Sequence, residues 1–138
     1  MRWRSSTGAK SSRRRSGLRV ARRIYVTDDP RACVAGVVER LCAEEGVPQS
    51  DVVILSSHAL AKSDFADARL GHFRLIENGD KGKGILFSSI RGFKGLESPA
   101  VILCELENLD DMTSDQQLYV GLSRARNYVA IVVPAPDD

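Results

Sequence analysis

The amino-acid sequence predicts an α/β protein with a mostly parallel central sheet and helices on both faces. The first sign is that β-prone stretches alternate with helical stretches from residue 24 onward. The second is that several β-prone stretches are continuously apolar, as expected of strands covered on both faces. The third is size, because 138 residues with 43% hydrophobic and 6% aromatic residues fit one small domain with an aliphatic core.

The sequence of the first part of the domain predicts a strand, a long helix and a second strand. The β-prone IYVT at 24–27 is the first strand, and the continuous apolar run at 51–57 is the second. Between them, Asp29 is suited to cap a helix, Pro30 to occupy its first position and Gly46 to end it. The apolar residues of this helix recur at helical spacing and define one buried face: Val34, Val37, Val38, Leu41 and Cys42.

The second part of the domain predicts four further strands. A weakly helical stretch at 58–68 precedes them, and the turn-rich link NGDKGKG at 78–84 follows the first of them. Their apolar, β-branched composition and their polar boundaries predict strands at 72–77, 85–90, 100–106 and 128–133.

A last helix is expected before the final strand. Thr113 and Gln116 have the spacing of a capping box, which predicts where the helix begins. Helical spacing then gives one apolar stripe of Leu118, Leu122 and Ala125. Tyr119 and Leu122 are expected to lie in the core.

The charge is distributed unevenly along the chain. The first 23 residues hold nine of the 20 Lys and Arg and none of the 18 Asp and Glu, so the remaining residues carry a net charge of −7. A Ser- and Arg-rich segment buries too little apolar surface to order itself, which predicts a disordered basic arm at 1–23 and a domain at 24–138. The arm is a solvated tail, upstream sequence exposed by truncation, or a contact for nucleic-acid phosphates. Its composition also resembles that of a transit peptide.

Several function classes lack the residues they require. No apolar run approaches the roughly 18 residues of a membrane-spanning helix, and no Cys or His spacing predicts a metal site. His58 and His72 have no evident partners. The phosphate loop GxxxxGK(S/T) is absent, because TGAKSS at 7–12 lacks the first glycine. The cysteines lie in apolar runs and are expected to be reduced, buried thiols of a cytoplasmic protein: Cys33, Cys42 and Cys104.

The stretch VILCELENLDD at 101–111 is an apolar strand with acidic residues at its end. It resembles the strand and acid that hold a magnesium ion in nucleotide hydrolases. The sequence lacks the phosphate loop that must accompany such an acid. We therefore expect Glu105 and Glu107 to lie in a solvated loop.

Two segments carry polar residues in an arrangement typical of a ligand site. In SSIRGFKGLESPAVIL (88–103), a strand runs into a polar loop where Gly95 allows close backbone approach and Glu97 can accept hydrogen bonds from a ribose. In QQLYVGLSRAR (116–126), the last helical turn carries Arg124, whose guanidinium matches a phosphate in a bidentate manner. In parallel sheets ligands bind beyond the carboxyl ends of the strands, so the loops after those ends are the places to look.

Together these segments resemble motifs V and VI of the UvrD/Rep-like superfamily 1 helicases, in their second RecA-like domain. Ser89-Ile90-Arg91, Lys94-Gly95-Leu96-Glu97 and the following apolar strand are similar to motif V. YVGLSRAR at 119–126 and the strand after it are similar to motif VI. The resemblance covers about residues 24–133. It implies a three-layer RecA-like fold, related to the phosphate-loop NTPases but without a phosphate loop of its own.

The resemblance also implies residue roles. Arg124 would reach the γ-phosphate of ATP, Glu97 would contact the ribose, and Gly95 would lie beside the nucleotide. The same motifs imply that three residues contact single-stranded nucleic acid: Ser89, Arg91 and Lys94. A guanidinium that stabilises charge on a transferred phosphoryl group raises the rate by about 10³–10⁵.

The implied function is the C-terminal half of an ATP-dependent DNA helicase or helicase-like ATPase. An N-terminal RecA-like domain, in cis or in trans, would hold ATP and its magnesium, and single-stranded DNA or RNA would be the other partner. The chain would then be a fragment, a truncated relative or half of a split machine, inactive alone. The alternative is a non-catalytic module derived from a helicase, which binds nucleic acid or docks onto a partner.

The sequence departs from the family at Arg91, where the family usually has His, and lacks a large insertion that many members carry. Local explanations of the site residues also exist. Arg124 and Arg126 would complement a helix dipole, with Asn127 as a left-handed cap. Lys94 would be an ordinary loop residue, and Glu97 would cap or pair locally.

Overall fold

The computed structural model describes residues 20–77 and 83–136. The predicted arm at 1–23 lies mostly outside this range, although residues 21–23 belong to the first strand. The link predicted at 78–84 also falls largely outside it. Among the described residues, no helix is long and apolar enough to cross a membrane.

A seven-stranded sheet forms the centre of the fold, in the order β1-β7-β6-β2-β5-β4-β3. All neighbouring strands are parallel except the short antiparallel pair β3 and β4. The expectation of a mostly parallel sheet is confirmed. The strands are β1 (Ala21–Thr27), β2 (Val52–Ser56), β3 (Arg69–Leu70), β4 (Phe73–Ile76), β5 (Ile85–Ser89), β6 (Ser98–Leu103) and β7 (Ala125–Pro134).

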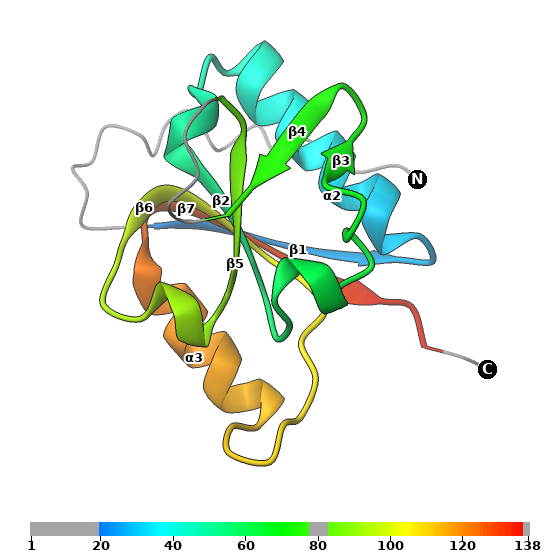
Figure 1. Cartoon of the computed structure of the whole chain (residues 1–138). Coiled ribbons are helices and arrows are strands. Elements are labelled where there is room, and N and C mark those ends of the chain that lie inside the picture. Colours follow the sequence, from blue (N-terminus) through cyan, green and yellow to red (C-terminus); the bar gives the residue numbers. More distant parts are fainter. Residues whose placement is uncertain (1–19, 78–82, 137–138) are drawn as a thin grey trace.

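Helices cover the two faces of the sheet (Figure 1). Helix α2 (Pro30–Glu39), continued by the π-helical turn η1 (Arg40–Glu44), joins β1 to β2, and α3 (Ser114–Arg124) joins β6 to β7. These two connections run in opposite directions along the sheet, so right-handed crossovers place their helices on opposite faces. Two hydrophobic clusters result, and successive residues such as Val53 and Ile54 in β2 belong to different clusters.

Helix α2 begins as predicted and ends at Glu39, and the π-helical turn η1 continues it to Glu44, just before the predicted stop at Gly46. The Asp29 carboxylate accepts a hydrogen bond from the Ala32 amide at 3.1 Å, and Pro30 is the first helical residue. Gly46 has a φ of +72°, a conformation that favours glycine after the helical turns. The predicted face is buried at Val34, Val37, Val38 and Leu41, while Cys42 is half-buried.

The helix expected at 58–68 is wrong, because only the short 3₁₀ turn η3 (Leu60–Lys62) forms there. The Arg31 guanidinium holds this segment in a non-helical shape instead. It donates to the Asp64 carbonyl at 2.6 Å and to the Asp67 carboxylate at 2.7 Å. The hydrogen bonds from Arg31 lower the pKa of Asp67. The sequence gives no local sign of a tether that comes from 33 residues away.

Helix α3 begins with the predicted capping box, in which Thr113 and Gln116 exchange hydrogen bonds with each other's backbone. Its buried face differs from the predicted apolar stripe. Gln117 and Gly121 face the sheet, while Leu118 and Leu122 are only half-buried. Tyr119 is 75% exposed, so the expectation that it lies in the core is wrong.

Close approach explains why a glycine faces the sheet in α3. A Cβ placed on Gly121 would lie 2.3 Å from Leu103 Cδ2, far inside van der Waals contact. The helix therefore rests on β6 at this glycine.

The cysteine thiols are free, with Cys33 and Cys104 buried and Cys42 half-buried. Burial raises the pKa of all three thiols, most strongly that of Cys104. They are therefore poor nucleophiles at neutral pH.

Candidate functional site

The amino-terminal ends of β6 and β7 bring the two polar segments together. Ser98 pairs with Ala125 in the parallel ladder, so these strand ends lie about 4.8 Å apart. Glu97 and Arg124 immediately precede this pair. The loop 94–97 and the end of α3 therefore lie next to each other where they enter β6 and β7, at the edge opposite to the carboxyl ends of the strands.

Arg124 has hydrogen-bonding capacity that its own domain leaves unused. Its side chain is half-buried, and its Nε is buried without a hydrogen-bond partner. No other buried side-chain nitrogen or oxygen among residues 20–77 and 83–136 lacks a partner. A buried donor without an acceptor costs about 1–3 kcal/mol, so an acceptor supplied from outside the domain would relieve this cost.

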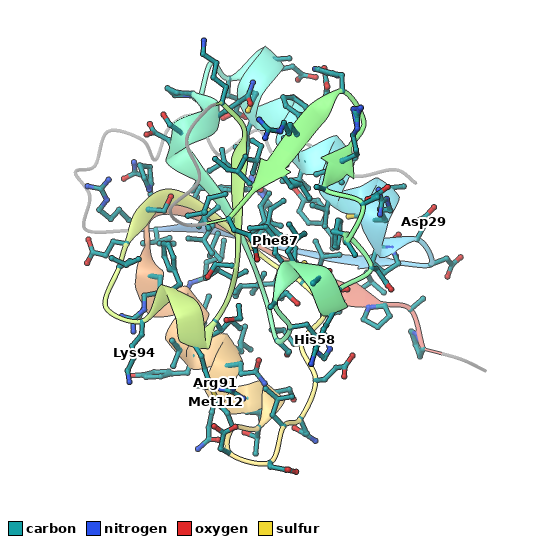
Figure 2. All side chains as sticks on the ribbon, in the orientation of Figure 1. Asp29, His58, Phe87, Arg91, Lys94 and Met112 are labelled. Atoms are coloured by element: carbon teal, nitrogen blue, oxygen red, sulfur yellow. The ribbon has the colours of Figure 1, made fainter. Side chains whose placement is uncertain are left out.

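The loop beside Arg124 is open. Lys94 and Glu97 are exposed, and neither side chain bonds to another residue in the described ranges. Gly95 has a φ of +79° with open space around its α-carbon, so a ligand can approach the backbone there. Figure 2 shows Lys94 on the outer side of its loop. Within residues 20–77 and 83–136 Glu97 has no partner, contrary to the interpretation of it as a cap or ion-pair residue.

The interpretation of Asn127 as a left-handed helix cap is wrong. Helix α3 passes directly into β7, where Ala125 has extended backbone angles of −92° and 129°. The ladder between β6 and β7 is irregular next to this point, between Ser98 and Ala100, and Arg126 and Asn127 are exposed there. Arg126 is therefore a strand residue and does not cap a helix.

Ser89 and Arg91 lie at the other edge of the sheet, where β5 ends. The Ser89 hydroxyl accepts a hydrogen bond from the Gly92 amide at 3.0 Å and so begins the 3₁₀ turn η4 (Arg91–Phe93). The Arg91 guanidinium pairs with Asp111 at 2.9 Å, and both side chains are mostly exposed. The structure thus separates the predicted site residues into two groups: Gly95, Glu97, Lys94 and Arg124 at one edge, and Ser89 and Arg91 at the other.

The expectation of a solvated Glu105 is wrong. Its carboxylate accepts hydrogen bonds from the Ser56 hydroxyl at 2.7 Å, the Ser63 hydroxyl at 2.8 Å and the Asp64 amide at 2.9 Å. Glu105 adopts a φ of +53°, which is uncommon for a residue with a Cβ. Its side chain thereby ties the loop after β2 to the end of β6. The described residues contain no group of three metal-ligating side chains.

A second polar network at this edge involves a residue that sequence reasoning missed. Gln117 is fully buried and accepts a hydrogen bond from the Ser57 hydroxyl at 2.6 Å. Its amide nitrogen donates to the carbonyls of Glu107, at 2.6 Å, and Met112. Exposed Glu107 also lies 3.2 Å from His58. The signal was available, because Gln117 lies four residues before Gly121 on the face that rests on the sheet.

Residues 84–132 match the family model of the UvrD-like helicase C-terminal domain. This segment contains both polar segments of the candidate site. The resemblance to UvrD-like helicases is confirmed. The match covers β5, β6, α3 and most of β7, and leaves α2 and the strands β1 to β4 outside it.

The whole described fold also resembles a solved structure, that of the C-terminal domain of a possible DNA helicase from Lactobacillus plantarum. The alignment covers 95% of this chain and 86% of that one, with a TM-score of 0.57 and 19% sequence identity. At this identity the likeness concerns the fold. No curated protein sequence matches the chain.

Proposed function

We propose that this chain is the second RecA-like half of an ATP-dependent DNA helicase or helicase-like ATPase. It supplies Arg124 and Glu97 to an ATP molecule held mainly by another RecA-like domain, in cis or in trans, which also carries the magnesium. One observation carries the proposal. The register of Ser98 with Ala125 brings an open Lys-Gly-Leu-Glu loop next to an arginine whose buried Nε has no partner.

Each residue of this edge has a physical role in the proposal. Arg124 donates to the γ-phosphate and offsets the charge that develops on it. Glu97 accepts from the ribose hydroxyls, and Gly95 lets the backbone lie against the nucleotide. Because the sequence contains no phosphate loop, the isolated chain is expected to bind ATP weakly and not to hydrolyse it.

The second part of the proposal concerns the edge where β5 ends. Ser89 and Arg91 contact single-stranded nucleic acid there, and Lys94 lies on the loop that continues toward the nucleotide. Arg91 must exchange Asp111 for a phosphate, which is feasible because an exposed ion pair is worth only about 0–1 kcal/mol. Movement of the two RecA-like domains would then couple ATP turnover to movement of the strand.

Titration of the labelled chain with magnesium-ATP, followed by NMR, tests the nucleotide site. Amide shifts are expected at Gly95, Glu97 and Arg124. Arg124→Ala should raise the dissociation constant for magnesium-ATP by about tenfold, or ~1.4 kcal/mol. Arg126→Ala is the matched control, since it removes the same charge from an exposed strand position two residues away. Shifts confined to the edge around Ser57, or equal effects of the two substitutions, would contradict the proposal.

A nucleic-acid-binding module without catalysis is the alternative, and the basic composition of residues 1–19 favours it. Its signature is salt-dependent binding of single-stranded DNA that persists in Arg124→Ala and disappears when residues 1–19 are deleted. The helicase proposal instead expects Arg91→Ala to weaken binding to single-stranded DNA while the arm is intact.

A further inference from the structure

Helix α3 presents an open pocket outside the proposed nucleotide site. It has a volume of about 440 Å³, and it lies along the outer side of the helix and the loop before it. Met112, Tyr119 and Val120 supply apolar surface, and Asp111 and Asp115 stand on its rim. Tyr119 is 75% exposed, so its ring is available to a group that enters the pocket.

The rim of this pocket belongs to the most acidic part of the chain. Residues 105–115 carry five Asp and Glu and no Lys, Arg or His. Asp115 forms no ion pair with any residue of the described ranges, and Asp111 is paired only with Arg91. A negatively charged partner such as a phosphodiester is therefore disfavoured here, and a cationic partner with an apolar group is favoured.

The chain itself contains a segment of this chemistry. Arg2-Trp3-Arg4 places the only tryptophan of the protein between two cations. Residues 1–19 hold seven Lys and Arg and no acid. Tryptophan provides the largest apolar surface for a pocket of this size, and flanking guanidinium groups complement carboxylates on a rim.

We propose that Arg2, Trp3 and Arg4 bind the α3 pocket of the same molecule. The Trp3 indole packs against the apolar floor, and the two guanidinium groups lie beside Asp111 and Asp115. This inference does not depend on the proposed helicase function.

The length of the connecting chain permits this contact. The first described residue, Val20, packs against the same hydrophobic cluster as α3, so the described part of the chain begins on the α3 face. A flexible connection from Trp3 to Val20 has a root-mean-square span of about 20–25 Å and a maximum of about 55–60 Å. A domain of this size has a radius of gyration of only about 13 Å. At the millimolar effective concentration of a short tether, even a weak contact is substantially populated.

The single tryptophan allows a direct test with the full chain. Acrylamide quenching of Trp3 fluorescence is compared with that of a synthetic peptide of residues 1–19, in which the indole is in solvent. We expect quenching at least about twofold weaker in the full chain and independent of protein concentration, as a tethered contact requires. Equal quenching of chain and peptide overturns the proposal. Protection that disappears on dilution also overturns it, because the occupant is then a second copy.

Exposed residues provide variants that leave the core intact. Asp115→Lys combined with Tyr119→Ala is expected to raise quenching to the peptide value. Asp28→Lys is the matched control, because it makes the same charge change on an exposed residue after β1 and should keep the protection. Protection that survives the pocket variant contradicts the proposed position. Circular dichroism verifies that each variant is folded.

A second measurement does not rely on altering the pocket. NMR spectra of the wild type and Trp3→Ala should differ at the amides of residues 111–120 and remain the same at 94–97. Arg2→Ala with Arg4→Ala should produce the same differences, whereas Arg13→Ala with Arg14→Ala removes equal charge away from the tryptophan and should not. Spectra of Trp3→Ala that match the wild type throughout residues 111–120 overturn the proposal.

Discussion

The two edges of the sheet differ in how their polar groups are used. At the carboxyl ends of β2 and β6, the side chains of Glu105 and Gln117 are saturated by hydrogen bonds from their own domain. At the amino ends of β6 and β7, Glu97 bonds to no residue that the structure describes, and Arg124 keeps a buried donor unbonded there. Polar groups at the first edge therefore stabilise the fold, and those at the second are free to act on something outside it.

The proposed nucleotide site therefore departs from the usual expectation for parallel sheets, in which ligands bind beyond the carboxyl ends of the strands. At the carboxyl ends of β2 and β6, whose connections leave in opposite directions, the Glu105 carboxylate instead bonds to Ser56 of its own domain. Substitutions should therefore separate the edges. Changes at Arg124 should impair catalysis without loss of stability, and changes at Glu105 or Gln117 should do the opposite.

Arg124→Ala is the substitution with the largest expected effect. In an ATPase assembled from this chain and a phosphate-loop domain, it should lower the turnover rate by about 10³–10⁵, which corresponds to about 4–7 kcal/mol of transition-state stabilisation. Steady-state ATP hydrolysis measures this loss. Urea unfolding should show no loss of stability, because the substitution removes a buried donor that has no partner.

The matched control is Arg126→Ala, which removes a guanidinium from an exposed strand position. It should leave turnover within about twofold of the wild type, since surface substitutions away from the site have small effects. Unchanged turnover in Arg124→Ala would indicate that the chain only docks onto a partner.

Gln117→Leu tests the saturated edge. It removes one hydrogen bond from the Ser57 hydroxyl and one from each of the carbonyls of Glu107 and Met112, although all three groups keep another bond. Each lost hydrogen bond costs about 0.5–1.5 kcal/mol, so we expect a loss of about 3 kcal/mol in the free energy of unfolding. Urea denaturation measures it.

Gln116→Leu serves as the control for Gln117→Leu, because Gln116 is the exposed neighbour and forms only the capping-box bond. Its cost should stay below about 1 kcal/mol. If the two substitutions cost the same, the buried network does not hold α3 in place.

The same substitution at two glycines compares the edges directly. Gly121→Ala puts a methyl group against Leu103, which is fully buried and has little room to move, and should cost about 1–3 kcal/mol despite the better helix propensity of alanine. Gly95→Ala meets no atom within 4 Å and should cost about 1 kcal/mol for its positive φ alone. Thermal unfolding of both variants measures the difference. A larger cost at Gly95 would mean that its loop is more tightly held than its open surroundings indicate.

The sequence predicted the architecture well where the signals are local. The capping box at Thr113, the helix start at Asp29 and the continuous apolar strand β2 all follow from residues within a few positions of one another. The pair of polar segments that matches the helicase family was recognisable for the same reason. Local spacing also predicted that Arg124 lies in the last turn of a helix.

Predictions failed where distant residues decide the structure. Arg31 holds the segment expected to be helical, and Glu105 finds its donors in a loop more than 40 residues away. The buried face of α3 was misassigned because Gln117 is polar, although a buried amide with three partners fits that position. Composition and spacing describe one element at a time, and these contacts depend on which elements the topology brings together.

The smallest expected effect is on how the free energy of unfolding depends on pH. Acidification should affect the contact of Arg31 with Asp67 and the loop at 94–97 independently of each other. The pKa of Asp67 is lowered in the folded state by the hydrogen bonds from Arg31, so this contact stabilises the protein above the unfolded-state pKa of about 4. The contribution is lost as pH falls through the lower folded-state pKa. Asp67→Asn should therefore be slightly less stable than the wild type at pH 7, and the two should converge toward pH 3. NMR shifts on acidification should appear at residues 63–69 in the wild type and be reduced in Asp67→Asn. Because Glu97 bonds to neither Arg31 nor Asp67, changes in the loop at 94–97 should be the same in both proteins. A difference between them there would show that the two edges are coupled.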